Sequence, residues 1–327
     1  MDSMFFSFSE DKIKCELCPN GCVLKDGATG LCGARKRNGD TIVIPYSGII
    51  SSSGLDPIEK KPLYHFKPGS RIFSVGFFGC TLHCGFCQNY SISQSYPGKS
   101  SGYQSPEEII SFLKGNDLSS IAFTYSEPTL HYEWVLETAK LCRQNGINTV
   151  LVTNGYLNAK PAELLLEHID AANIDMKSAS NEFYEKICSG KIVPVKEFIK
   201  VAYGKKVHIE ITTLVITDTN DDISECIEIR DFISGISTDI PYHISRYRPE
   251  YKFEKPATPV STINRWIKTA KEKLDFVYGG NIMESGETYC KKCNNLLVDR
   301  AGYSTIINGL KKDGTCSKCG GMNYFIM

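Results

Sequence analysis

The middle of the chain alternates short apolar runs with amphipathic stretches, and this alternation predicts strands separated by helices. The predicted strands are Arg71–Phe77, Ser120–Tyr125, Asn148–Thr153, Ala172–Asp175, Lys206–Val215 and Pro241–Ser245. A strand, helix, strand order is typical of βαβ units built around a parallel sheet. About six such units predict an α/β fold, a partial (β/α)6-type TIM barrel or a complete one, with a doubly wound sheet as the alternative.

Helix boundary signals support this alternation. Ser105–Glu108 (Ser-Pro-Glu-Glu) combines a capping residue, a proline at the first helical position and early acids. The segment Pro128–Asn145 has apolar residues at helical spacing and stops before Gly146, a residue typical of helix C-termini. Segments Ser180–Cys188 and Asp221–Ser234 have a similar pattern, so we expect helices there.

Composition narrows the class of protein. The 327 residues are 42% hydrophobic and 23% charged, which indicates one large domain with appendages, or two domains. Lys plus Arg and Asp plus Glu both number 37, so no overall positive field favours nucleic acid or an anionic membrane. The first residues lack the pattern of a signal peptide, and no stretch approaches the ~20 apolar residues of a membrane span. We therefore expect a cytoplasmic protein.

Cysteine is unusually frequent. Fourteen cysteines are many for a reducing compartment, where clustered cysteines more often bind metals than form disulfides. Three groups contain eleven of them: Cys15, Cys18, Cys22 and Cys32; Cys80, Cys84 and Cys87; Cys290, Cys293, Cys316 and Cys319. Cys142, Cys188 and Cys226 lie in predicted helices and are expected to be buried apolar filler.

The positions of these groups predict three parts. We expect an N-terminal four-cysteine metal-binding module over residues 1–65, a barrel over 66–283 and a zinc-ribbon-like module over 284–327. Two CxxC pairs about 20 residues apart are a strong zinc signature, with rubredoxin-like iron or an auxiliary cluster as alternatives. For the N-terminal set, zinc is the first expectation and an auxiliary iron–sulfur cluster that relays electrons is the second.

The residues that follow each predicted strand carry chemistry. In β/α barrels the active site lies at the C-terminal ends of the strands. The residues found there are the loop Gly79–Asn89 with three cysteines, Glu127, Asn154, Asp175, Lys177, Asp218 and His243. The sequence therefore predicts that metal ligands, acids, an amide, a lysine and a histidine converge on one rim.

The central group, Cys80-x3-Cys84-x2-Cys87, has one cysteine too few for a closed site. Structural zinc and a fully ligated [4Fe-4S] cluster both take four ligands. Three thiolates on such a cluster leave one iron open to a substrate or cofactor. Zinc completed by His83 or by a distant residue is the alternative, which the position of the loop on the rim disfavours.

This three-cysteine spacing resembles that of the radical S-adenosylmethionine (SAM) superfamily. The resemblance implies that the open iron binds the amino and carboxylate groups of SAM. It also implies that one electron cleaves the sulfonium to a 5'-deoxyadenosyl radical, which abstracts hydrogen from a substrate. The cofactor carries that chemistry, and the protein orients and shields it. Phe86, beside the third cysteine, is expected to shield the cluster.

The same resemblance assigns roles on the rim. Glu127 takes the place of the superfamily's Gly-Gly-Glu segment, which meets the SAM amino group, although Tyr125 and Ser126 replace the glycines. Asp175-Met176-Lys177 looks like the Asp-x-Lys element of the pyruvate formate-lyase activating enzyme group. In that group the aspartate faces the SAM amino group or ribose, and the lysine meets the carboxylate.

Three further residues are candidates for SAM contact. His243 lies in a segment similar to that group's Pro-Tyr-His and would be a second carboxylate partner. Asn89 parallels the asparagine of its Cys-His-Asn and would touch the ribose, and Asn154 is a candidate for SAM or substrate contact. The alternative for each is a satisfied polar group that closes a strand end.

A narrower resemblance comes from the run Asp56–Phe66, from Pro68–Ser70 and from the N-terminal cysteine spacing. These resemble the radical SAM component of the AmmeMemoRadiSam system. The resemblance implies a reducing electron donor such as flavodoxin or ferredoxin, with Memo-like and AMMECR-like proteins as candidate partners. Glu59, Lys60, Lys61 and His65 are candidates for lining the substrate entrance or touching a partner. A solvated charged loop is the alternative.

Together these features predict a radical SAM enzyme that acts on an unidentified protein, RNA or small molecule. A glycyl-radical-enzyme activase is one alternative, although the additional cysteines are not placed as the ferredoxin-like insert that many activases carry after the cluster loop. A non-catalytic iron–sulfur or zinc scaffold that senses redox state is another. That scaffold gives no reason for Glu127, Asp175, Lys177 and His243 to meet on one rim.

Overall fold

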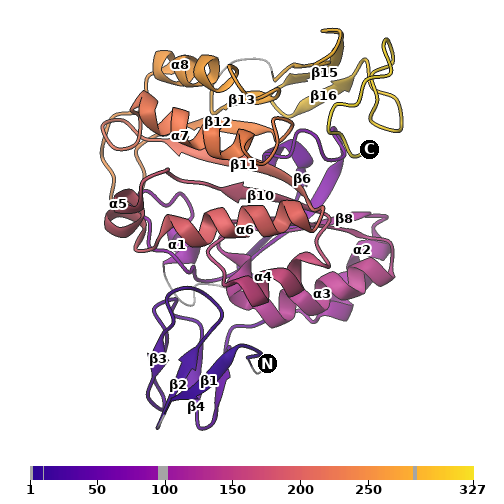
Figure 1. Ribbon diagram of the computed structural model, residues 1–327. Coiled ribbons are helices and arrows are strands. Elements are labelled where there is room, and N and C mark those ends of the chain that lie inside the picture. The colour runs from indigo at the N-terminus through magenta and orange to yellow at the C-terminus, as the bar shows by residue number, and fades with distance from the viewer. Residues whose placement is uncertain (1–2, 10, 95–101, 283–285) are drawn as a thin grey trace.

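The computed structural model describes residues 3–9, 11–94, 102–282 and 286–327 and is built around one sheet of eight strands (Figure 1). The strands lie side by side in chain order: β6 (Ser52–Pro57), β7 (Arg71–Gly76), β8 (Ser120–Thr124), β9 (Asn148–Thr153), β10 (Ala171–Asp175), β11 (His208–Val215), β12 (Tyr242–Arg246) and β13 (Val277–Gly280). Strands β7 to β13 are parallel, and β6 pairs antiparallel with β7. Because β6 and β13 are the two edges, the barrel is partial, as predicted.

All six predicted strands are present, with ends shifted by at most two residues. They were recognisable because strands covered on both faces are continuous apolar runs, and all five residues of β8 are buried. The two edge strands escaped prediction. β6 reads Ser-Ser-Gly-Leu-Asp-Pro, which has no β-branched or aromatic residue, and β13 is only four residues long and ends in Gly279 and Gly280.

Helices cover the outer face of the sheet (Figure 1). They are α2 (Pro106–Gly115), α3 (Tyr132–Gln144), α4 (Ala159–Leu166), α6 (Ile192–Gly204), α7 (Ile223–Ser234) and α8 (Val260–Ala270). Ser105 and Glu108 form the reciprocal capping box that starts α2. The predicted helix over 128–145 is split into a 3₁₀ turn, Pro128–His131, and α3. It ends before Gly146, which has a positive φ of 68°.

The predicted helix over 180–188 is a short α5 (Asn181–Phe183) followed by a π-helical turn, Tyr184–Cys188. π-Helical turns are rare in proteins, and those that occur frequently lie at functional sites. Short helices also occur at Ile58–Lys60 (3₁₀) and at α1 (Tyr90–Ser93). Across the ranges given above, no helix combines the length and apolarity needed to cross a membrane.

Small β-structures lie at opposite ends of the molecule (Figure 1). The N-terminal one contains β1 (Phe6–Ser9), β2 (Lys12–Cys15) and β3 (Val23–Leu24), with a hairpin of β4 (Lys36–Asn38) and β5 (Thr41–Val43). The C-terminal one contains β14 (Thr288–Tyr289), β15 (Leu296–Ala301) and β16 (Ser304–Ile307). The sheet starts upstream of the boundary expected near residue 66, because β6 is hydrogen-bonded to β7 along its whole length.

Candidate active site

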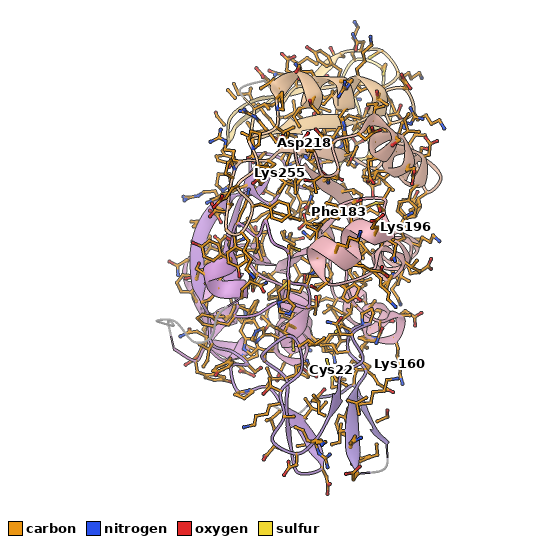
Figure 2. The ribbon with its side chains drawn as sticks, turned by 90° about the vertical axis from the view of Figure 1, so that its left-hand side faces the viewer. Cys22, Lys160, Phe183, Lys196, Asp218 and Lys255 are labelled. Atoms are coloured by element: carbon orange, nitrogen blue, oxygen red, sulfur yellow. The ribbon has the colours of Figure 1, made fainter. Side chains whose placement is uncertain are left out.

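One cavity of about 510 Å³ lies at the C-terminal edge of the parallel strands. Its size is typical of small-molecule sites. It is lined by all three central cysteines and by every residue predicted to contact SAM: Cys80, Cys84, Cys87, Phe86, Asn89, Glu127, Asn154, Asp175, Lys177 and His243. Figure 2 views the side of the molecule where Phe183, after β10, and Asp218, after β11, lie one above the other. The residues predicted on the rim therefore line one cavity, with the exception of Asp218, which is not among its lining residues.

The cysteine loop follows β7 and enters this cavity. Cys80 Sγ accepts hydrogen bonds from the Leu82 backbone N and from Asn154 Nδ2, both at 3.4 Å. Cys87 Sγ lies 3.1 Å from Ser93 Oγ. Burial raises the pKa of Cys80 well above its usual range, so its thiolate needs a compensating cation.

The sulfurs of Cys80, Cys84 and Cys87 do not converge on the position of a single metal ion. Among the described residues, one group of three or more cysteines, histidines and acids has all its ligand atoms within 4.8 Å of one another. That group is the four C-terminal cysteines. An iron–sulfur cluster binds each cysteine to a different iron, so its ligands stand further apart than those of a single ion. The three-thiol set therefore fits a cluster better than a lone metal ion.

Glu127 is buried and ties the ends of β8 and β9 together. Its Oε1 accepts hydrogen bonds from Thr129 N, Thr129 Oγ1 and Thr153 Oγ1 at 2.7–3.1 Å. Oε2 accepts one, from the Asn154 backbone N at 2.8 Å. Burial raises the pKa of this carboxyl group. Since a carboxylate oxygen has two lone pairs, Oε2 can accept a further hydrogen bond, and Glu127 is one of the residues that line the cavity.

Asp175 and Lys177 form an ion pair at the end of β10, with Lys177 Nζ 2.9 Å from Asp175 Oδ2. The Tyr184 hydroxyl accepts a hydrogen bond from the Lys177 backbone N, which anchors the turn. Burial alone would lower the pKa of Lys177, yet Asp175 and the neighbouring Cys84 raise it overall. The lysine therefore brings a positive charge to the cysteine loop.

His243 is held by a carboxylate that the sequence reasoning missed. Its Nε2 lies 2.7 Å from Glu210 Oε2, inside the barrel on β11. Glu210 also accepts from His208 Nε2 and from the backbone N of Tyr64 and of His65. The signal available in the sequence was the only acid of this strand, placed between Ile209 and Ile211 in His-Ile-Glu-Ile-Thr-Thr-Leu-Val.

The charged run at 59–61 lines the same cavity, with Glu59 and Lys61 buried and Lys60 exposed. Lys61 is 2% exposed, and its Nζ bonds to Asp56 Oδ2 at 2.7 Å over the Tyr125 ring. Glu59 Oε1 accepts from the Gly69 N and from Thr305 Oγ1, both at 2.7 Å, which ties the cavity wall to the C-terminal module. Lys60 also lines the cavity, as does Tyr303 of that module, which was not predicted.

His65 does not lie at the entrance. Its side chain is fully buried, bonds to Tyr278 Oη at 2.6 Å and stacks on Phe325. The expectation failed because the C-terminal segment covers this residue, and sequence spacing gives no sign of that contact.

His83 and the three cysteines outside the groups bear on the alternative metal ligands and on the expected role of the ungrouped cysteines. The ring nitrogens of the exposed His83 bond to Gln94 Oε1 and to the Leu31 carbonyl, and His83 is not among the residues that line the cavity with the three cysteines. Cys142, Cys188 and Cys226 are fully buried, as expected. Cys188 is nevertheless more than filler, because its thiol hydrogen-bonds to Cys84 and, with burial, raises the pKa of that cysteine.

Comparison with known proteins agrees with this architecture. The family model of the radical SAM superfamily matches residues 74–230. The chain is 36% identical to the uncharacterized protein MJ0808 of Methanocaldococcus jannaschii over 329 residues, covering 98% of this chain and 97% of that protein. It is 25% identical to the pyruvate formate-lyase 1-activating enzyme of Escherichia coli K12 over 232 residues, covering 66% of this chain and 92% of that enzyme.

A solved structure shows the same fold. Streptococcus suis SuiB bound to S-adenosylmethionine superposes with a TM-score of 0.51 at 15% identity, covering 65% of this chain and 52% of SuiB, so the likeness spans about half of that protein. The matched family model, the near full-length relative and the fold agree with one another. This chain belongs to the radical SAM superfamily.

Proposed function

We propose that this protein cleaves SAM reductively at a [4Fe-4S] cluster held by Cys80, Cys84 and Cys87 and abstracts hydrogen from a substrate bound beside it. The observation that carries this proposal is one cavity lined by three thiols, two acids, a lysine and a histidine at the ends of parallel strands. When bound, the cluster and SAM supply the one-electron cleavage and the hydrogen abstraction. The superfamily implies both cofactors.

The chain's own residues would bind and orient SAM. Lys177 and His243 are the carboxylate partners, and the open position on Glu127 Oε2 suits the ammonium, since a buried ammonium needs an acceptor. Asp175 holds Lys177 in place and is the second candidate for the ammonium or ribose. Phe86 is 5% exposed and would exclude water from the thiols. Asn89 and Asn154 complete the polar wall.

The direct test is anaerobic reconstitution with iron and sulfide, followed by dithionite and SAM, with 5'-deoxyadenosine measured by mass spectrometry. We expect product from the reconstituted protein and none from protein loaded with zinc instead. A reconstituted protein with no cluster signal in electron paramagnetic resonance would contradict the proposal and favour the non-catalytic scaffold.

A glycyl-radical-enzyme activase is a second candidate. It is favoured by the similarity to the Escherichia coli activating enzyme, which extends over 92% of that protein. Incubating the reduced, SAM-loaded protein with a glycyl radical enzyme and recording the glycyl radical signal separates this function from action on other proteins, RNA or small molecules. Assignment to the AmmeMemoRadiSam system, with Memo-like and AMMECR-like partners and a flavodoxin or ferredoxin donor, is likewise a proposal based on the sequence motifs.

Substitution Lys177→Met is expected to weaken SAM binding by about 10–100-fold, because a hydrogen bond to a charged group contributes roughly 1.5–3 kcal/mol. The exposed Lys200, which pairs only across the surface with Glu197, supplies the matched control Lys200→Met. Equilibrium dialysis of SAM against the reconstituted variants measures both. Equal affinities in the two variants would remove Lys177 from the site and would suit a redox-sensing scaffold.

For the C-terminal module we infer a structural zinc ion. The sulfurs of Cys290 and Cys319 lie 3.6 Å apart, and those of Cys293 and Cys316 lie 3.7 Å apart, as in a closed four-thiolate site. Burial raises the pKa of Cys290, yet backbone N–H groups of Cys293 and Lys292 lower it overall, which favours the thiolate that metal binding needs.

Substitution Cys316→Ser should therefore lower the zinc content by about one equivalent per chain and lower the thermal unfolding midpoint. Cys226→Ser, which removes a buried thiol far from this group in the sequence, is the control. Inductively coupled plasma mass spectrometry gives the zinc content. Retention of the full zinc content in Cys316→Ser would overturn the assignment.

A further inference from the structure

The N-terminal module contains a second group of four cysteines around a small cavity of its own. Cys15, Cys18, Cys22 and Cys32 line it, together with apolar Leu17, Leu24 and Leu130 and the guanidinium-bearing Arg35. Cys22 lies at the end of this module that faces the barrel (Figure 2). No step of SAM binding described above uses these residues.

The C-terminal cysteines provide an internal comparison. Four sulfurs on one zinc at about 2.3 Å lie roughly 3.8 Å from one another, and the C-terminal sulfurs approach this spacing. The four N-terminal sulfurs line one cavity yet do not all lie within 4.8 Å of one another. A site whose thiols surround a space without converging on its centre suits a ligand of several metal atoms.

Each of these sulfurs has a backbone N–H donor. Leu17 donates to Cys15, Asn20 to Cys18, and Leu31 to Cys22 at 3.5 Å. Ala34 and Arg35 both donate to Cys32. N–H···S bonds of this kind stabilise thiolates and tune iron–sulfur clusters, although zinc knuckles share them. They mark the group as a metal site without choosing the metal.

The surroundings of Arg35 favour an iron–sulfur cluster over zinc at this site. The Arg35 side chain is 2% exposed, and its two terminal nitrogens bond to Glu133, Ser3 and the Leu130 carbonyl. Its Nε–H has no hydrogen-bond partner among the described residues, although burying a donor without an acceptor is costly. Arg35 lines the cavity, so inorganic sulfide in a bound cluster would supply an acceptor on the side of this N–H, whereas a zinc ion closed by four thiolates adds no acceptor.

The cavity also abuts the cysteine loop of the barrel. Asn20, two residues after Cys18, donates from Nδ2 to the Thr81 carbonyl at 2.9 Å. His83 Nε2 lies 3.0 Å from the carbonyl of Leu31, the residue before Cys32. Thr81 directly follows Cys80, and His83 directly precedes Cys84. Two short paths of covalent bonds and one hydrogen bond each therefore join the N-terminal cysteines to the barrel cysteines.

We infer that the N-terminal cysteines hold an auxiliary iron–sulfur cluster, not zinc, that relays one electron to the barrel. A one-electron donor of the flavodoxin or ferredoxin class is oxidised by one electron. The auxiliary cluster takes up that electron and passes it to the barrel cluster, with no bond made or broken in the transfer. The relay rests on the proposed function, whereas the presence of the cluster does not.

The first test removes the barrel site altogether, by combining Cys80→Ala, Cys84→Ala and Cys87→Ala in the full chain. After anaerobic reconstitution we expect iron and acid-labile sulfide in about equal amounts, with a paramagnetic signal after dithionite reduction. Adding Cys15→Ala and Cys32→Ala should abolish both, whereas adding Cys142→Ala should not. Zinc at two equivalents and no sulfide in the triple variant would overturn the inference. An intact N-terminal signal with no SAM cleavage by the unsubstituted protein would overturn only the proposed function.

The second test probes Arg35, with circular dichroism used to confirm that the variant is folded. Arg35→Lys keeps a cation beside Glu133 and removes the Nε–H. We expect the auxiliary cluster to assemble with a more negative reduction potential, because hydrogen bonds to sulfur favour the reduced state. Arg37→Lys, which alters an arginine bonded to backbone carbonyls of the same module, is the control. Equal potentials in the two variants would show that Arg35 does not face a cluster.

Discussion

Replacing Cys84 with alanine is expected to abolish 5'-deoxyadenosine formation completely. Cys84 is buried in the wall of the cavity that holds Lys177 and His243, and a three-thiolate cluster has no ligand to spare. Iron content should fall by about half if the N-terminal cluster remains, since each site then holds a separate cluster. Cys142→Ala, which removes a buried thiol on α3, should change neither quantity.

Cys188 complicates the interpretation of that variant and therefore belongs in the experiment. Its thiol bonds to Cys84, so it is a candidate replacement ligand when the Cys84 sulfur is absent. The double variant Cys84→Ala, Cys188→Ala removes this route. Mass spectrometry of the product and electron paramagnetic resonance of the reduced proteins measure the outcome. Product from the double variant at the rate of the unsubstituted protein would show that the three-cysteine loop is not the site of SAM cleavage.

The six inner strands of the barrel sheet, β7 to β12, were predictable because they are largely buried and appear in the sequence as mainly apolar runs. The cavity followed from them, since parallel strands end at one edge and residues after different strands must meet there. This reasoning brought Cys84, Glu127, Lys177 and His243 together in advance, and all four line the cavity. Local spacing and topology were enough because Cys84, Glu127 and Lys177 lie in the segments that follow β7, β8 and β10, and His243 lies within β12 itself.

What escaped prediction depends on contacts between distant segments. Glu210 holds His243 and also the backbone of Tyr64 and His65, about 145 residues upstream. Tyr303 reaches the cavity only because the C-terminal module packs beside the run at 59–61. His65 was misplaced for the same reason, since Phe325 covers it. No local pattern encodes such packing.

Substitution Glu210→Gln is expected to lower the free energy of unfolding by about 3–5 kcal/mol, the range for breaking a buried charged pair. Each oxygen of Glu210 accepts two hydrogen bonds, one from a backbone N–H and one from a histidine. Glutamine replaces one of these oxygens with an amide NH2 group. This group is itself a donor, so it cannot accept the hydrogen bond of the backbone N–H that it faces. SAM affinity should fall as well, because His243 loses the partner that orients it.

The same carboxylate makes stability depend on pH. Burial alone would raise the pKa of Glu210, but hydrogen bonds from His208 and His243 lower it well below its ordinary value of 4.5. A lowered pKa means that the carboxylate stabilises the fold above pH 4.5 and that this contribution is lost as the pH falls below it. Glu210→Gln should lack this component, so its stability should change less in that acidic window.

Thermal unfolding of the cluster-free protein, followed by circular dichroism at neutral and acidic pH, measures both effects. The exposed Glu163 on α4 provides the matched control, since Glu163→Gln should change stability by less than about 0.5 kcal/mol. If Glu210→Gln unfolds at the same temperature as this control, the four hydrogen bonds do not stabilise the barrel. If it is destabilised but binds SAM normally, His243 is positioned by something other than Glu210.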